Sequence, residues 1–135
     1  MFWAPVLRAA DGDAELLVNG GTTTITTTEV FTGELYPLTE GDVGYESTAQ
    51  RNAAVVTGGG ELKLSSPADV WVKNDDNHTT FLRVGYGSGT SGDGTLTIES
   101  GATLRVGSAT RYANFQLGQG GGVTGTVNQT GGDAT

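Results

Sequence analysis

The sequence predicts an all-β chain wound as a right-handed parallel β-helix (β-solenoid), with about three short strands in each coil of 31–34 residues. Three observations lead to this fold class. The second half of the chain repeats itself, its short β-prone elements alternate apolar and polar residues, and glycines separate them. With 36% hydrophobic residues, 7% aromatic residues and 23 glycines among 135 residues, a turn-rich β fold suits the chain better than a helical bundle.

The repeat extends from about residue 60 to the last residue. Residues 60–72 align without gaps on residues 94–106, 34 positions later, and a third copy begins at Gly125, 31 positions after Gly94. A second element, Leu82-Arg83-Val84-Gly85, returns 33 positions later as Phe115-Gln116-Leu117-Gly118. The apolar-polar-apolar order places both apolar side chains on one face of an extended chain, which predicts short half-buried strands.

Strand starts at 62, 70, 82, 96, 104, 115 and 127 follow a three-beat cycle, which predicts three strands per coil stacked on their equivalents one coil later. The expected stacks are Leu62 on Leu96 on Val127, Leu64 on Ile98, Val70 on Leu104, Val72 on Val106, Leu82 on Phe115 and Val84 on Leu117. All of these residues are predicted to be buried. The polar residues between them are predicted to be exposed: Lys63, Thr97, Arg83, Arg105 and Gln116.

An antiparallel β-sandwich is the alternative fold, since short alternating strands with glycine turns also suit it. It does not require gapless similarity at a 34-residue offset, so the repeat favours the solenoid. The glycine runs 85–89 and 118–122 are then interpreted as corners of the coils.

The chain divides into a less regular part and a regular part. Residues 1–57 are predicted to form an amino-terminal cap, an irregular segment and early strands, because residues 33–52 show no clear period. Residues 58–135 are predicted to form the regular coils, with a carboxyl end that is open or truncated. The apolar stretch 1–10 has no basic leader and is too short to span a bilayer, so neither a complete signal peptide nor membrane insertion is predicted.

Charge excludes nucleic acid as a partner. The net charge is -8, and residues 1–50 hold eight acidic residues against Arg8 alone. Phosphate binding needs clustered basic side chains, which this chain lacks. The sequence contains no cysteine, so neither disulfides nor thiolate metal sites contribute.

Leu82-Arg83-Val84-Gly85, followed by Gly94-Thr95-Leu96-Thr97-Ile98 and by residues 125–132, resembles the repeats of large bacterial surface proteins. These are the autotransporter-associated β-helical passengers and the PEP-CTERM-anchored solenoids. The resemblance covers residues 55–135 well and 14–30 loosely. It implies a structural or assembly module of a secreted or cell-surface protein, and an extracellular or cell-surface location.

Enzymatic function is not predicted. The outward stacks, such as Lys63 with Thr97 and Asn128, contain no pair of carboxylates, and His78 is the single histidine. No catalytic, cofactor-binding or metal-binding residue is therefore assigned. Calcium remains an alternative, because residues 11–15 and 74–77 offer hard oxygen ligands. The threonine run 22–28 suggests an ice-binding ladder, but Lys63 interrupts it.

An adhesive or carbohydrate-binding module is the alternative function. Aromatic rings stack on sugars, and Trp71 and Tyr112 are the candidate glycan contacts. Trp71 is predicted to point outward by the strand pattern, although the 74–81 loop could equally cover it.

The last expectation concerns self-association. The strand equivalent to residues 104–106 is expected to begin near Thr135, which leaves the final coil with one strand of its three and with an unpaired edge. Such an edge is expected to pair either with the remaining coils of a longer parent or with another subunit. In the second case the chain would polymerise head-to-tail into a filament, through Phe2, Trp3, Val6 and Leu7 of one subunit and Val127 of the next.

Overall fold

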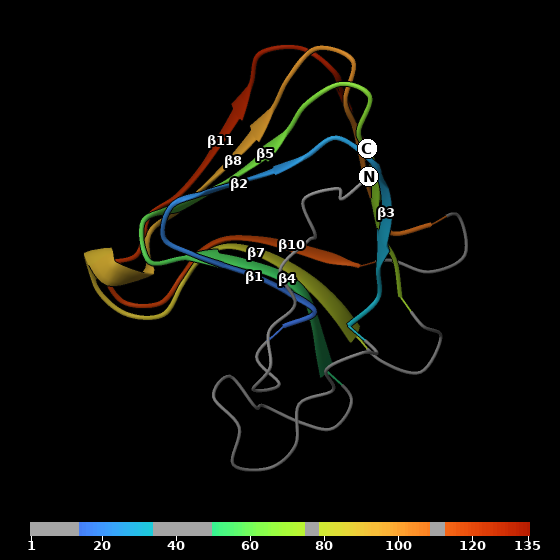
Figure 1. Cartoon of the computed structure of the whole chain (residues 1–135). Coiled ribbons are helices and arrows are strands. Elements are labelled where there is room, and N and C mark those ends of the chain that lie inside the picture. Colours follow the sequence, from blue (N-terminus) through green and yellow to red (C-terminus); the bar gives the residue numbers. More distant parts are fainter. Residues whose placement is uncertain (1–13, 34–49, 75–78, 109–112) are drawn as a thin grey trace.

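The computed structural model describes residues 14–33, 50–74, 79–108 and 113–135, which form a parallel β-helix (Figure 1). Its three sheets each contain four strands. Sheet A is β1 (Leu16–Asn19), β4 (Gln50–Thr57), β7 (Thr79–Tyr86) and β10 (Asn114–Gln119); sheet B is β2 (Thr22–Ile25), β5 (Gly60–Leu64), β8 (Gly94–Ile98) and β11 (Gly125–Gln129). Sheet C is β3 (Thr28–Phe31), β6 (Asp69–Val72), β9 (Thr103–Val106) and β12 (Asp133–Ala134), and a 3-10 turn, η1 (Thr90–Gly92), precedes β8.

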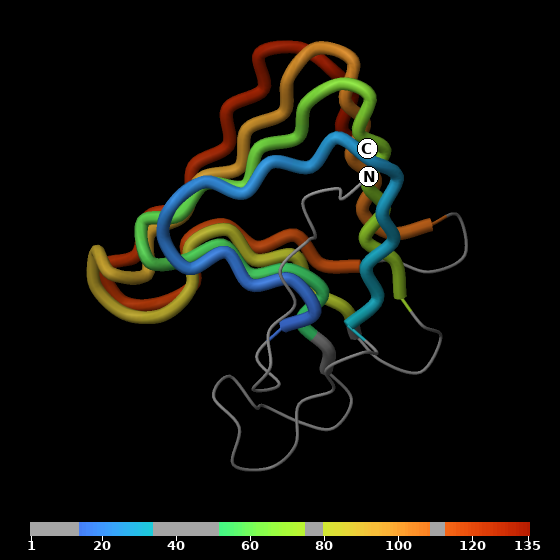
Figure 2. Tube along the Cα trace, in the orientation of Figure 1, coloured from blue at the N-terminus to red at the C-terminus, as the bar shows by residue number. Residues whose placement is uncertain are grey.

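The chain visits sheets A, B and C in turn, so the described residues make four coils, β1–β3, β4–β6, β7–β9 and β10–β12. In Figure 2 the first coil lies in front and the chain runs clockwise as it recedes, which is a right-handed path. Every pairing between neighbouring coils is parallel. The predicted fold class is confirmed, and the antiparallel sandwich is excluded.

The predicted stacking is confirmed residue by residue. Leu62 pairs with Leu96 and Leu96 with Val127, while Leu64 pairs with Ile98. On the other two sheets, Val70 pairs with Leu104, Val72 with Val106, Leu82 with Phe115 and Val84 with Leu117. The same columns continue into the first coil, where Leu16 stacks on Ala54 and Val18 on Val56.

The core is the narrow interior enclosed by the three sheets. Leucine, isoleucine and valine from successive coils fill it, and Leu16, Leu64, Val84 and Leu96 are fully buried. A cavity of about 10 Å³ lies among core side chains that include Leu16, Leu64 and Leu96, and its lining is apolar. A cavity of this size and polarity stays dry.

A column of glycines makes the corner between sheets A and B. Gly60, Gly94 and Gly125 occupy equivalent positions in successive coils. A Cβ added to Gly94 would lie 2.3 Å from the carbonyl oxygen of Val56, and one added to Gly125 would lie 2.1 Å from that of Val84. The corner therefore packs backbone against backbone, and the close contact admits no side chain.

Two groups of burial predictions are wrong, one at the last coil and the other on the outer faces of the sheets. Phe115, Leu117 and Val127 are exposed and Val106 is half-buried, because these residues lie at or beside the end of the stack. Arg83 and Thr97, which were expected to be exposed, are buried.

Each of the two buried polar residues packs against a specific outer-face group. The Arg83 guanidinium lies over the rings of Phe81 and Tyr86, at 4.3 and 4.7 Å from their centroids. The Thr97 hydroxyl donates a hydrogen bond of 2.6 Å to Glu61. Lys63, Arg105 and Gln116 are partly exposed.

The expected end of the last coil also needs correction. β12 pairs with β9, with Ala134 beside Leu104, so the coil that was expected to stop after the strand at Val127 has a second strand. The third strand arrives earlier than expected because Gly131 and Gly132 tighten the preceding corner, where Gly132 has a φ of 70°.

We predict that Gly94→Ala destabilises the fold by about 1–3 kcal/mol, because its methyl group would overlap the Val56 carbonyl in a corner that cannot widen without separating two coils. Urea unfolding followed by circular dichroism measures the change. Gly121→Ala is the matched control, since an added Cβ there meets nothing within 4 Å. Equal stability of the two variants would contradict the close backbone contact.

Candidate functional site

In the carboxyl-terminal coil, apolar side chains that occupy inward positions of the solenoid are exposed to solvent. Phe115 is 39% exposed, Leu117 53% and Val127 36%. Their partners one coil earlier, Leu82, Val84 and Leu96, are at most 1% exposed. The same register therefore gives a closed interior in the third coil and an open apolar face in the fourth. We call Phe115, Leu117, Val127 and the edges of β10–β12 the open face.

The open face also presents backbone. β10, β11 and β12 each have a paired strand on one side only in the described part of the chain. Natural sheet edges are usually protected from further pairing by lysines or by inward-pointing charges. Residues 113–135 contain a single charged side chain, Asp133, and the inward position next to Val127 holds the neutral Gln129. Two of the three edges, β10 and β11, thus lack this protection.

The first coil has the opposite character. Its inward apolar residues Leu16, Val18, Ile25 and Phe31 are at most 2% exposed, so they are shielded within the chain itself. Glu29 occupies the register position of the buried Val70, which places a carboxylate at an inward position of the outermost strand of sheet C. A charge at this position opposes the addition of a further strand.

Glu15 completes the amino-terminal end. It is 6% exposed and accepts hydrogen bonds from the backbone amides of Thr32, at 3.1 Å, and Gly33, at 2.9 Å. These amides follow β3, so the carboxylate joins the start of the first coil to its end. Polar contacts of Glu15 thus link the two ends of the first coil.

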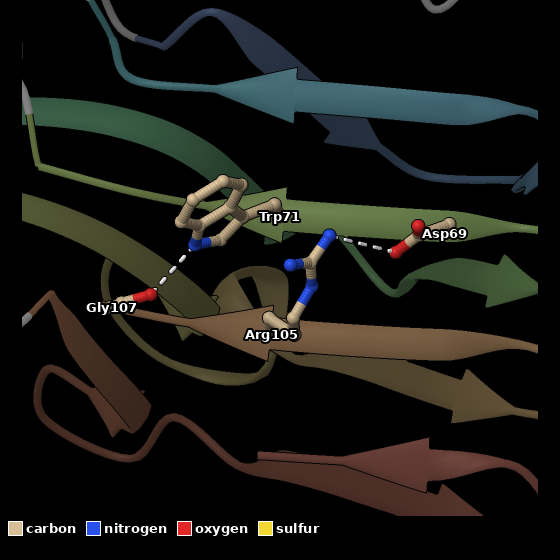
Figure 3. Close-up of polar contacts among 4 residues, drawn as sticks. All are labelled: Asp69, Trp71, Arg105 and Gly107. Carbon is tan, nitrogen blue, oxygen red and sulfur yellow. Dashed lines mark hydrogen bonds and ion pairs between the residues drawn. The ribbon is translucent and has the colours of Figure 1, made fainter. Parts of the chain in front are cut away.

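The outer face of sheet C holds the predicted glycan residue Trp71 (Figure 3). Its indole N–H donates a 2.6 Å hydrogen bond to the carbonyl of Gly107. The Arg105 guanidinium lies 4.6 Å from the ring centroid and also pairs with Asp69 at 3.3 Å, and the Lys73 amine lies 4.8 Å from the same ring. Trp71 is outward and half-buried, as part of a cluster with two cations.

The outer face of sheet B carries the threonine ladder considered for ice binding. Thr24, Lys63, Thr97 and Asn128 follow one another in register, so Lys63 interrupts the column as expected. Glu61 accepts hydrogen bonds from Thr97 and, at 3.4 Å, from Thr22. These contacts stabilise the face as part of the solenoid.

Several predicted residues lie outside the described residues, namely Phe2, Trp3, Val6, Leu7, His78 and Tyr112. The candidate calcium loops fall there as well, except for Ala14, Glu15 and Asn74. Within the ranges that the structure describes, no group of three or more His, Cys, Asp or Glu side chains comes together as a metal site. Of the self-assembly residues, Val127 is placed, and it lies on the open face beside Phe115 and Leu117.

Sequence reasoning missed Phe115 and Leu117 as surface residues. Their local pattern is that of buried strand residues. The one feature of the sequence that could have predicted their exposure was their position in the last copy of the repeat. Exposure at this position depends on whether another coil follows, which is a property of the stack and not of the strand.

We predict that Glu15→Ala lowers the free energy of unfolding by about 1–3 kcal/mol, because the buried amide of Gly33 and the partly buried amide of Thr32 lose their acceptor. Glu15→Gln keeps an oxygen acceptor at the same place and should lose less. Thermal and urea unfolding of both variants measure the difference. An alanine variant as stable as the wild type would show that the carboxylate does not close the first coil.

Comparison with protein-family models, with curated proteins and with solved structures found no match to this chain in any of the three. Among the described residues there is no helix that is long and apolar enough to cross a lipid bilayer.

Proposed function

We propose that the chain is a structural and assembly module of a secreted or cell-surface bacterial protein, and that it associates through the open face. The supporting observation is the exposure of Phe115, Leu117 and Val127 in register with fully buried residues of the preceding coil. The resemblance of residues 55–135 to the repeats of bacterial surface solenoids agrees with this role.

Solenoid energetics support the same function. Each coil buries its apolar side chains against the coils above and below, and the last coil therefore gains stability when another array of strands covers it. Coils of a longer parent or a second subunit would supply that cover. Head-to-tail polymerisation is one form of the proposal, with residues 1–8 of the next subunit lying on the open face.

We predict that the purified chain self-associates and that Val127→Lys weakens this association at least tenfold. The lysine places a charge in the contact but, at an exposed position, leaves the folded coil intact. Sedimentation velocity over a range of concentrations gives the dissociation constant. Val30→Lys is the matched control, because Val30 is 48% exposed and lies far from the open face, on the outer side of β3.

A chain that stays at 13.8 kDa up to about 1 mM, the weak end of specific association, would reject self-association and leave the coils of a longer parent as the cover. The head-to-tail form has its own test. If residues 1–8 of one subunit cover the next, then deleting them reduces particle size in light scattering, and an unchanged size excludes that arrangement.

The alternative function is adhesion to a glycan through Trp71. The specific observation is a partly exposed indole on the outer side of sheet C, flanked by Arg105 and Lys73 and by the Asp69 carboxylate. Aromatic rings bordered by charged and polar groups suit the stacking and hydrogen bonding of a sugar.

For this alternative we predict saturable binding to at least one sugar on a glycan array, with loss of binding in Trp71→Ala and retention in Trp71→Phe. Val30→Ala, a neighbour of Trp71 on the same sheet, serves as the control. Binding that survives Trp71→Ala would place any glycan site elsewhere, and an array without a positive signal would reject the adhesive function.

A further inference from the structure

We infer that the sugar bound at Trp71 is an acidic one, with a carboxylate or sulfate group held by Lys73 and Arg105. This inference rests on the adhesive function proposed above as the alternative, and it names the class of sugar. The site lies on the outer face of sheet C, where Trp71 belongs to β6 and Arg105 to β9 (Figure 3).

The first step is that the indole ring is fixed in place. Its N–H donates the 2.6 Å hydrogen bond to the Gly107 carbonyl, and the Gly107 amide in turn donates to the Val72 carbonyl at 2.8 Å. The hydrogen-bond donor of the ring is therefore already used within the protein. A ligand at Trp71 must be recognised by the ring surface and by the charged groups around it.

The second step is the position of two cations beside this ring. The Arg105 guanidinium lies 4.6 Å and the Lys73 amine 4.8 Å from the ring centroid, within the range of a cation–π interaction. A neutral sugar that stacked on a ring face held by either cation would have to displace that cation. An acidic sugar meets the same cations as partners, because its anionic group can contact them at the border of the ring.

The third step is the charge of the cluster. Arg105 pairs with Asp69 through one nitrogen at 3.3 Å, and Figure 3 shows the guanidinium between the ring and this carboxylate. Within the described part of the chain no carboxylate pairs with Lys73, which is partly exposed. Two cations against one carboxylate leave a positive excess on a chain whose net charge is -8. This excess favours an anionic ligand, with Lys73 as the group available to it.

The fourth step favours a sugar over other anions. The Asp69 side chain is 44% exposed, so its carboxylate is available to accept hydrogen bonds from hydroxyl groups. Trp71, Lys73 and Asp69 thus offer an aromatic surface, a cation and an acceptor, which match the apolar face, the anionic group and the hydroxyls of one acidic sugar. An acidic peptide such as polyglutamate has neither the hydroxyls nor the apolar ring face.

Calorimetric titration with galacturonate oligomers, and with the same oligomers as methyl esters, tests the inference. The ester keeps the sugar ring and removes the charge, so it should bind at least about tenfold more weakly. Lys73→Met keeps the aliphatic stem and should lose about tenfold in affinity for the acid, whereas Lys73→Arg should retain it. Lys63→Met is the matched control, because Lys63 is a partly exposed lysine on the outer face of sheet B.

Salt provides a second measurement on the unmodified protein. Raising the NaCl concentration from about 0.05 M to about 0.5 M shortens the screening length from about 14 Å to about 4 Å. Binding of the acid should weaken over this range more than binding of the ester, because only the acid is held by charge. A sulfated oligosaccharide of the same length identifies the anion, and tighter binding of either acid than of the ester supports the inference.

The outcomes separate this inference from the function on which it rests. An ester bound as tightly as the acid, with binding lost in Trp71→Ala, overturns the acidic class and leaves the adhesive function standing. Polyglutamate bound as tightly as the galacturonate oligomer, or an affinity that Lys73→Met leaves unchanged, also overturns the inference. Absence of binding to every sugar on a glycan array overturns the adhesive function as well. Circular dichroism of each variant verifies that the coils are folded.

Discussion

The structure depends on the vertical stacking of inward side chains. No single coil has a core of its own, because each coil contributes only one strand to each of the three sheets. Leu96 is buried because Leu62 lies on one side of it and Val127 on the other, and the same holds for Val84 between Val56 and Leu117. Burial is thus shared between neighbouring coils, so stability is a property of contacts along the axis. The glycine corner at Gly60, Gly94 and Gly125 keeps those coils at backbone contact.

This dependence makes the two ends the decisive parts of the molecule. At the amino-terminal end the chain interrupts the apolar columns: Thr23 stands where Leu62 follows and Glu29 where Val70 follows. Glu15 satisfies the backbone amides after β3. At the other end the columns run on to Phe115, Leu117 and Val127, and the single polar interruption there is the neutral Gln129. The first coil thus interrupts two of the apolar columns, whereas the fourth coil continues most of them like an interior coil.

Much of the fold could be predicted from the sequence, because gapless repeats fix the register of β5 on β8 and of β6 on β9. The first coil was harder to predict, since Leu16 and Ala54 lie 38 positions apart and Ala54 and Leu82 only 28, so unequal corners hide the period. Arg83 shows a second limit. The alternating pattern predicts that Arg83 points outward from β7, but not that its side chain is buried there beside Phe81 and Tyr86. At Phe115 the pattern gives the direction of the side chain, while its exposure depends on the number of coils.

The shape of the open face limits what can cover it. Its three strand edges run in three directions around one apolar centre, so a single extended segment or helix would cover one edge and leave the other two in water. The partner that satisfies all three at once must itself carry three strands around an apolar interior, which is a description of another solenoid coil. An inward charge in that coil would be unfavourable, since a carboxylate buried without a partner over the sheet C column that ends at Ala134 would cost several kcal/mol. Among the described strands the fourth coil has no charged inward residue, whereas the first coil has Glu29 at an inward register position. The proposed association through the open face would therefore use the same stacking of inward side chains that holds each coil on the next.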